Sequence, residues 1–314
     1  WKSKFGPQKR GKIILGLRSD YFSATQENVI SPRVNLQFLP NPITTLHFAY
    51  GRHYQFPDYF MVLRNEKNRD MKSKFTDQFV VGMERFFDRD FRGSVEAFYK
   101  TYSQIPTLYY WTNQPENYPI ESLDHVQHWI NEGEGEAYGV ELFLQKKLFD
   151  KWHGIFSYAW SHARMKNYRN LYSNIGGNEL QEDAEWVDSD FDYRHQLTVI
   201  GGYKHKFKKA EEIEISFRFG YNSGRPYSER EYVPEWRDWE MAEHNSERFP
   251  EYHRLDIMLI HRKSFKRFNL VSFVDVMNIY NHDNVWDFAY NPDGTIEEVW
   301  QYKTMPIGGV RLEF

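Results

Sequence analysis

Three aspartates at alternate positions have the spacing that comes nearest to a ligand set for a hard cation such as calcium. Asp188, Asp190 and Asp192 would supply carboxylate oxygens, which calcium prefers. A complete EF-hand loop also needs a glycine turn and a trailing bidentate glutamate, and neither follows here. We therefore interpret the three aspartates as the solvated acidic end of a loop, and we expect no metal ion.

Two histidines at helical spacing raise the question of zinc. His125 and His128 could share one face of a helix, but the surrounding sequence offers no third ligand, so we expect surface histidines. The 314 residues include no cysteine, which excludes thiol chemistry, disulfides and cysteine-based zinc sites. The sequence also shows no nucleophile with a base, no phosphate-binding glycine loop and no recognisable carboxylate pair. We expect neither catalysis nor a cofactor.

Aromatic side chains in long polar stretches are the other groups with binding chemistry. Tyr109, Tyr110 and Trp111 cluster in one such stretch, and Trp236 and Trp239 occur in another. Exposed rings can stack on a ligand or bind a partner. The alternative is an aromatic girdle at a membrane surface, or packing of one loop on another. We take these five residues as candidate substrate-binding residues.

The segment that reveals the architecture is residues 212–224, EIEISFRFGYNSG. Its apolar side chains fall on one side of an extended chain and its charged side chains on the other, because a strand has a period of two. Two environments fit this pattern. One is a sandwich strand with its charges in bulk water, and the other is a membrane-barrel strand with lipid outside and water within.

The remainder of the chain favours the barrel. Alternating segments of about ten residues recur roughly twelve times, and the connections between them alternate between short and long. Aromatic residues make up 18% of the chain although the mean hydropathy is −0.76, and no run of about 18 apolar residues occurs. The sequence predicts an all-β, transmembrane, antiparallel up-and-down β-barrel.

Two segments near the end of the chain are less regular. Both alternate sets of residues 268–280 contain apolar side chains, so the pattern does not assign their faces. Residues 281–304 read as a loop, with a small hairpin around the Asn-Pro-Asp-Gly turn at 291–294.

The charged side chains of the alternating segments should line the water-filled interior. These residues are Arg18, Arg33, Glu84, Glu96, Glu141, Glu214 and Arg218. The net charge of −4 gives no reason to expect nucleic acid as a partner.

Several segments resemble the barrel of TonB-dependent outer-membrane receptors, in the same order along the chain. They are SPRVNLQFLPNPITTLHFAYGRHYQFP (31–57), GEAYGVELFLQKKL (135–148), DFDYRHQLTVIGGYKHKF (190–207), GYNSGRPY (220–227), YHRLDIMLIHR (252–262) and FVDVMNIYNHDN (273–284). Each segment alone is a weak indication, but their order over nearly the whole chain is specific.

The resemblance implies a barrel of about twenty-two strands around a plug domain. Residues 1–314, which begin at Trp1, would supply its C-terminal part, and we expect the plug, the TonB-contacting segment and the first strands upstream. The interior residues would contact the plug, and Phe314 would be the recognition signal for the barrel-assembly machinery. The implied partners are outer-membrane lipid of a Gram-negative cell, the protein's own plug and first strands, the TonB complex, and a small-molecule or glycan substrate.

The function that this resemblance implies is active uptake. External loops would capture a scarce nutrient, such as a siderophore, cobalamin or a glycan, and TonB-relayed energy would import it. Two alternatives stay open: a passive, porin-like barrel, and a non-transport outer-membrane anchor or assembly component. The sequence does not identify the substrate.

Overall fold

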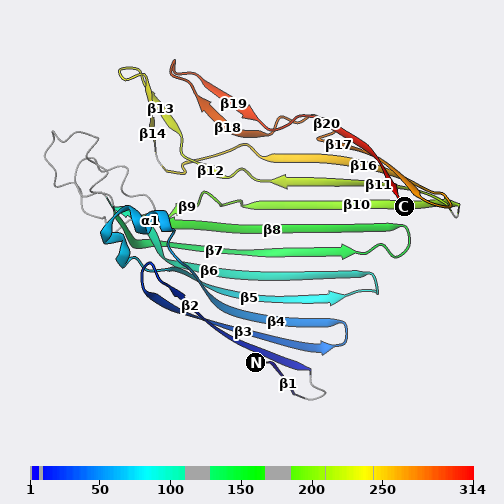
Figure 1. Cartoon of the computed structure of the whole chain (residues 1–314), viewed down its shortest axis with the longest axis horizontal. Coiled ribbons are helices and arrows are strands. Elements are labelled where there is room, and N and C mark those ends of the chain that lie inside the picture. Colours follow the sequence, from blue (N-terminus) through cyan, green and yellow to red (C-terminus); the bar gives the residue numbers. More distant parts are fainter. Residues whose placement is uncertain (1, 7–9, 110–127, 167–184, 209, 243) are drawn as a thin grey trace. The chain divides into compact units, whose positions relative to one another are not determined.

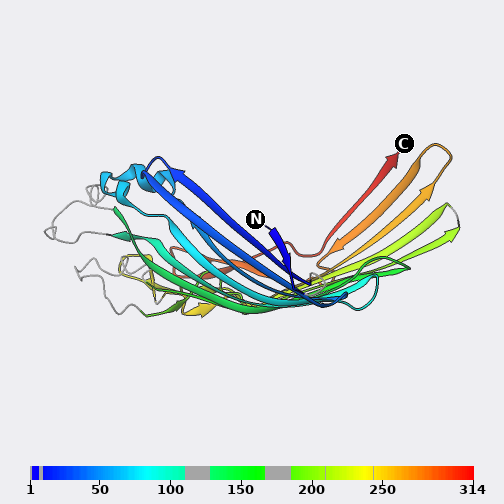
Figure 2. The ribbon, with the colours of Figure 1, turned by 90° about the horizontal axis from the view of Figure 1, so that it is seen from below.

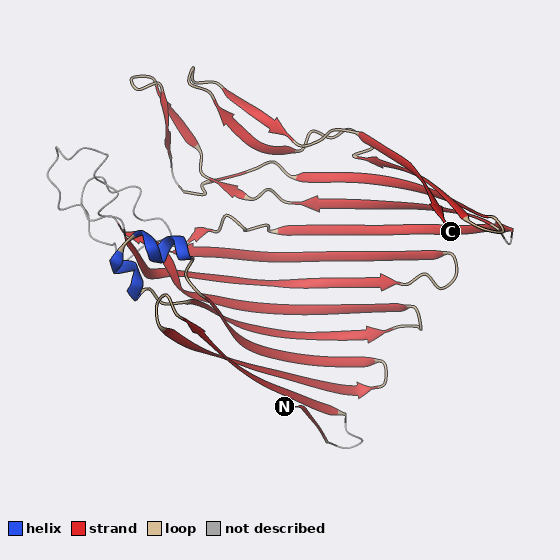
Figure 3. Cartoon of the chain, viewed as in Figure 1, coloured by secondary structure: helices blue, strands red, loops and turns tan. Residues whose placement is uncertain are grey.

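The computed structural model describes residues 2–6, 10–109, 128–166, 185–208, 210–242 and 244–314. These residues are mostly β-strand, and the helices α1 (Tyr59–Arg64) and η2 (Glu66–Asp70) follow β4 (Figure 3). Tyr110, Trp111 and His125 lie outside the described residues. No helix among the described residues has the length and apolar character needed to cross a membrane.

The main sheet is antiparallel, and its strand order follows the chain (Figure 1). Its strands are β1 (Lys2–Phe5), β2 (Gly11–Phe22), β3 (Glu27–Asn41), β4 (Thr44–Gln55), β5 (Lys74–Phe86), β6 (Phe91–Tyr109), β7 (His128–Lys146), β8 (Trp152–Lys166), β10 (His195–Lys208), β11 (Glu211–Asn222), β16 (Tyr252–Ser264), β17 (Asn269–Met277) and β20 (Met305–Glu313), with β9 (Val187–Asp188) beside β8. Apart from the four-residue β1, the described path holds twelve strands of 9 to 19 residues. This confirms the predicted antiparallel fold class with its roughly twelve sequential strands.

Three small two-stranded sheets lie in the long connections of the C-terminal part. β12 (Pro226–Tyr227) pairs with β15 (Glu247–Arg248), and β13 (Arg230–Val233) pairs with β14 (Asp238–Met241). β18 (Val285–Tyr290) pairs with β19 (Ile296–Trp300), which confirms the hairpin predicted around residues 291–294. Four of these short strands, β12 to β15, fold within the connection 225–252.

Contacts divide the chain into two compact units, which we describe separately. Unit 1 comprises Trp1–Gly82, Ala97–Gly139 and His162–Ser189. Unit 2 comprises Met83–Glu96, Val140–Ser161 and Asp190–Phe314.

In unit 1, strand register separates an apolar face from a polar face. Leu15, Val34 and Tyr50 lie opposite one another on β2, β3 and β4 and form one row of the apolar face. The neighbouring row, on the other face, is Gly16, Arg33 and Gly51. Because side chains alternate along every strand, this division continues along the sheet.

Helices α1 and η2 lie at the end of β4, beside the turn between β2 and β3 (Figure 2). Phe22 stacks on Phe56 with ring centroids 4.7 Å apart and meets the edge of Tyr59 at 5.3 Å, which holds α1 at this turn. The alternating pattern of the sequence predicted neither helix. They are one or two turns long, too short for a helical period to show in the sequence.

In unit 2, the same division covers β8, β10, β11, β16, β17 and β20. Glu214 and Arg218 lie on the polar face, where Arg218 is opposite Asp256. The register of β17 resolves the segment whose faces the sequence left open: Val274 is opposite Leu259 and shares the apolar face. Phe273 and Val271 therefore lie on the polar face, and this is why both alternate sets looked apolar.

The described residues contain little conventional core. Seven hydrophobic residues are buried, whereas forty-six large hydrophobic side chains are exposed, among them Leu17 at 75% and Val310 at 70%. An exposed apolar surface on this scale is unfavourable in water and suits a surrounding of lipid.

Candidate functional site

Two hairpins pack together in the long connections of unit 2. The Tyr232 hydroxyl of β13 donates a hydrogen bond to the Pro292 carbonyl at 2.8 Å. The Trp239 indole of β14 donates to the Asn291 carbonyl at 2.8 Å, and its ring meets Tyr290 edge-on at 4.9 Å. The turn between β18 and β19 is thus held against the β13–β14 hairpin by two hydrogen bonds and a ring contact. We call this pair the loop platform.

A second aromatic cluster contacts the loop platform through Phe288 of β18. Tyr227 contacts Phe249 and Phe288 with ring centroids 4.6 and 5.2 Å apart, and Phe249 and Phe288 stack at 5.2 Å. The Arg225 guanidinium lies over Phe249 at 4.5 Å. Burial raises the pKa of the Tyr227 hydroxyl, with smaller contributions from Tyr290 and from nearby carboxylates. The cluster holds together the segments that connect the strands of the main sheet to the hairpins.

The structure separates the two tryptophans that the sequence grouped. Trp236 occupies the tip of the β13–β14 hairpin and is 68% exposed, so it can meet a ligand. Trp239 is half-buried in the loop platform and acts in packing. Tyr109 ends β6, and with Tyr110 and Trp111 outside the described residues, the cluster 109–111 stays a prediction.

Sequence reasoning missed another set of exposed rings, on and after the β18–β19 hairpin. Trp286, Trp300 and Tyr302 are 62, 48 and 83% exposed. The Lys303 ammonium lies 4.6 Å from the centre of the Trp300 ring, and the Trp300 indole N–H donates a hydrogen bond to Glu298 at 2.9 Å. The available signal was three aromatic residues flanking a turn that had already been recognised.

Asp192 connects the segment that precedes β10 to β15. It is 1% exposed, Arg194 donates to its carboxylate at 2.5 Å, and Arg248 forms an ion pair with the same oxygen. Arg248 also donates to the carbonyls of Asp192 and Gly224, at 3.0 and 3.1 Å. A carboxylate that pairs with two guanidinium groups stabilises the packing of the segments that carry them.

The expectation of a solvated acidic loop end was therefore wrong for Asp192, because two arginines compensate its buried charge. Asp190, also in unit 2, accepts a hydrogen bond from the Asn245 amide at 2.8 Å. In unit 1, Asp188 contacts the His162 imidazole at 3.0 Å.

Asn278 and Asn284, in the motif FVDVMNIYNHDN, form hydrogen bonds that hold the connection after β17 against β16. Asn278 is fully buried and has a positive φ of 50°. Its backbone N–H donates to the Asp256 carboxylate at 3.0 Å, and its side-chain amide forms hydrogen bonds with the backbone of His282. Asn284 pairs with the His253 backbone through both amide atoms, at 2.9 and 3.1 Å. The residues that carried the family resemblance here have structural roles, since a buried asparagine tolerates the left-handed region and satisfies backbone groups.

The charges on the polar face of unit 2 form a ladder of ion pairs. Glu212 contacts Lys204 at 2.9 Å and Arg262 at 3.5 Å, and Arg262 reaches Glu313 at 2.6 Å. Glu214 lies 3.8 Å from His153 and 3.9 Å from Lys204.

A second group lies further along the same face. Asp256 contacts both Arg218, at 3.1 Å, and Arg254, at 2.9 Å. Glu214 and Arg218, which we expected to line an interior, thus have charged partners within the wall.

The other predicted interior residues differ in their surroundings. Arg18 pairs with Asp20 at 2.7 Å in unit 1, and Glu84 pairs with Arg92 at 3.0 Å in unit 2. Glu96 is half-buried on β6, and Glu141 is exposed on β7. Phe314 is 96% exposed, and its ring lies 6.3 Å from Phe268. Contact of these residues with a plug, and of Phe314 with assembly machinery, stays a prediction.

Tyrosine hydroxyls mark one end of the apolar face of unit 1. Tyr50 donates to Asp77 at 2.8 Å, and Arg52 contacts the same carboxylate at 2.6 Å. Tyr99 donates to Glu136 at 3.2 Å, and Arg164 reaches that carboxylate at 2.6 Å. Ion pairs avoid hydrocarbon, so the apolar band ends at these tyrosines.

Unit 2 repeats the arrangement on its own apolar face. Tyr158 bonds to the His195 ring at 2.8 Å, and Tyr221 donates to Glu251 at 3.1 Å. A ring with an apolar body and a polar tip suits the boundary between lipid and water. Both units therefore carry an apolar band that stops at a row of hydrogen-bonded tyrosines.

A sequential antiparallel sheet with an exposed apolar band, an ion-paired polar face and folded hairpins in its long connections defines the wall of a membrane β-barrel protein. The model of the family "TonB dependent receptor-like, beta-barrel" matches residues 5–281, and the chain belongs to this family. No curated protein matches the chain.

Solved structures share the fold at low sequence identity. The outer membrane transporter YddB from Escherichia coli has a TM-score of 0.66 at 15% identity, covering 96% of this chain and 42% of its own. The ferripyoverdine receptor of Pseudomonas aeruginosa has a TM-score of 0.66 at 14% identity, covering 100% of this chain and 38% of its own. BauA, the ferric preacinetobactin receptor of Acinetobacter baumannii, has a TM-score of 0.66 at 12% identity, and the match covers 98% of this chain and 41% of BauA. The chain thus spans about two fifths of the length of these proteins.

Proposed function

We propose that this chain is the C-terminal part of the barrel of an outer-membrane transport receptor. In this proposal a larger barrel of about twenty-two strands closes around a plug, and the chain supplies twelve of its strands. The family membership and the two-fifths coverage of the solved transporters support this proposal. The single observation that carries it is the exposed apolar band opposite an ion-paired polar face, because only a lipid exterior and a wet interior stabilise both.

The loop platform is the proposed capture surface for the nutrient. Its rings Trp236, Trp286 and Trp300 are exposed, while the packed Trp239 holds the two hairpins together. Rigidly supported exposed aromatic rings suit ligands with apolar or planar surfaces, such as a siderophore, cobalamin or a glycan. Three of the solved structures of this fold are named as receptors or transporters of iron-loaded molecules, which makes the siderophore class the first to test.

The transport proposal is tested by uptake in whole cells. A strain lacking the gene would be complemented with the full-length receptor or with its Trp236→Ala and Trp286→Ala variants. Uptake would be measured for radiolabelled ferric siderophores, labelled cobalamin and fluorescent oligosaccharides, with and without a proton uncoupler.

We expect the receptor to restore uptake of one ligand class, the uncoupler to abolish that uptake, and the variants to raise the concentration needed for half-maximal uptake. Uptake that persists with the uncoupler would replace active transport by a porin-like barrel. A folded surface protein that restores no uptake would leave the anchor or assembly role.

A further inference from the structure

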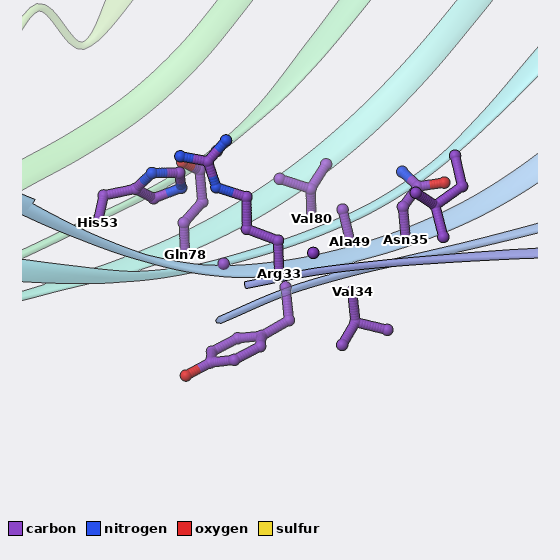
Figure 4. A pocket seen from close by; sticks show the side chains of 11 residues that line it. Arg33, Val34, Asn35, Ala49, His53, Gln78 and Val80 are labelled. Carbon is purple, nitrogen blue, oxygen red and sulfur yellow. The ribbon is translucent and has the colours of Figure 1, made fainter. Parts of the chain in front are cut away.

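Arg33 stands in a trough on the polar face of unit 1. The trough has a volume of about 360 Å³ and is lined by strands β2, β3, β4 and β5. Figure 4 shows the side chains of Arg33, His53 and Gln78 on one side of the sheet, with Val34 pointing to the opposite side. The trough therefore opens on the polar face, and its nearest long side chains all carry nitrogen donors.

Two glycines make the space beside Arg33. Gly16 on β2 and Gly51 on β4 are its cross-strand neighbours, so no side chain flanks it in its own row. A Cβ at Gly16 would lie 3.7 Å from the Cβ of Arg33, and one at Gly51 would lie 2.9 Å from His53 Nε2. Gly16 thus leaves open space on one side of Arg33, whereas the His53 imidazole covers Gly51 on the other side.

Arg33 differs from Arg18, Arg52 and Arg164 of unit 1, each of which has a carboxylate partner. Arg52 and Arg164 have carboxylate oxygens at 2.6 Å, and Arg18 has one at 2.7 Å. Arg33, by contrast, has neither an ion pair nor a hydrogen bond to any described residue.

A second unsatisfied group lines the same trough. The Asn35 side-chain oxygen is buried and has no hydrogen-bond partner among the described residues. An asparagine amide can turn by half a rotation, so it can present either an acceptor or a donor to a ligand. The trough thus combines one unpaired cation with three neutral or weakly basic polar groups, Asn35, His53 and Gln78.

We propose that the Arg33 trough is a carboxylate-binding site on the water-facing side of the barrel wall. A planar guanidinium binds a carboxylate through two parallel hydrogen bonds, and Gly16 leaves room for a ligand beside Arg33. The carboxylate can come from an acidic side chain elsewhere in the same receptor or from a free ligand in the barrel. The inference rests on the proposed water-facing side of the wall and is independent of energised uptake.

The test measures the chemical accessibility of Arg33 in the full-length receptor in outer-membrane vesicles. Phenylglyoxal, which modifies uncomplexed guanidinium groups, would be added, and the rate at Arg33 followed by mass spectrometry of its peptide. Malonate would be the carboxylate probe, with malonamide and sodium chloride at equal ionic strength as controls. Arg218, paired with Asp256 at 3.1 Å, is the internal reference.

If the ligand is free, about 20 mM malonate should slow modification of Arg33 about tenfold, as expected for a site of millimolar affinity, with no effect on Arg218. Malonamide and sodium chloride should have little effect. Gly16→Val, which keeps the charge and narrows the trough, should lose most of this protection.

If the carboxylate is internal, Arg33 should be unreactive without malonate. The Arg33→Lys variant should then form an amide cross-link with that carboxylate when treated with a carbodiimide, and the cross-linked peptide identifies the residue. Rapid modification that malonate does not slow would overturn the proposal, as would an unreactive Arg33 whose lysine variant forms no cross-link. Neither readout depends on uptake, so failure here is distinct from failure of the transport proposal.

Discussion

The division of each strand between lipid and water can be tested at two adjacent residues of β11. Phe217 lies mid-strand on the apolar face and is 42% exposed, and Ser216 lies on the polar face, opposite Gly202 and Met258. We predict that Phe217→Arg destabilises the receptor strongly, whereas Ser216→Arg does so little.

The magnitude follows from where each arginine would sit. An arginine near the bilayer midplane on the lipid face of a barrel costs about 2 to 4 kcal/mol. We expect about 3 kcal/mol for Phe217→Arg, which is about a hundredfold in the folding equilibrium constant. At Ser216 the new guanidinium lies on the polar face, the same face as Glu214, so we expect a change within about 1 kcal/mol.

The assay is urea-induced unfolding of the receptor in lipid vesicles, followed by tryptophan fluorescence and by the heat-dependent shift in gel mobility of folded barrels. Phe217→Leu is the control for loss of the aromatic ring without added charge, and it should change stability by about 1 kcal/mol.

Equal destabilisation by the two arginine variants would refute the assignment of faces. A larger loss for Ser216→Arg than for Phe217→Arg would reverse it, with the apolar face inside. In either case the apolar face of β11 would not be the face that meets lipid, and the proposed membrane barrel would be wrong.

Three further predictions concern Asp192, Trp239 and Asn278. Asp192→Asn should lower the free energy of unfolding by about 2 to 3 kcal/mol in the same urea assay, because Arg194 and Arg248 lose their shared counterion while keeping partial exposure. Asp190→Asn, whose carboxylate contacts the Asn245 amide and no arginine in these ion pairs, should cost less, about 1 kcal/mol. Trp239→Ala should speed tryptic cleavage of the β13–β14 hairpin about tenfold or more, since it removes a hydrogen bond and a ring contact, whereas an unchanged cleavage rate would show that the two hairpins are held by other contacts. Asn278→Ala should be less stable than Asn278→Gly by about 1 kcal/mol, because alanine is strained at a φ of 50° and glycine is not, and equal stabilities would show that the lost hydrogen bonds dominate.

Much of the fold was readable from the order of side chains along the chain. The alternation in residues 212–224 predicted a strand with one apolar and one charged face, and β11 has these faces. The turn at residues 291–294 predicted the β18–β19 hairpin. Both features are local, because a two-residue period and a tight turn depend on the backbone of a few neighbouring residues.

The roles of individual polar residues were not readable in this way. Nothing in the sequence distinguishes Arg33, which has no counterion within the described residues, from Arg18, which pairs with Asp20. Asp192 looked like part of a solvated acidic segment, yet Arg248, fifty-six positions away, lies beside it. Such pairings depend on contacts that only the folded chain brings together.

The sequence by itself therefore determined the strand pattern, the two kinds of face and the resemblance to a family, since these follow from composition and short-range period. Only the tertiary structure decided that Trp236 is exposed while Trp239 is packed, and that β17 turns Val274 to the apolar face. The physical reason is that burial and ion pairing are properties of neighbours in space. Strand register and loop packing choose those neighbours from segments far apart in the chain.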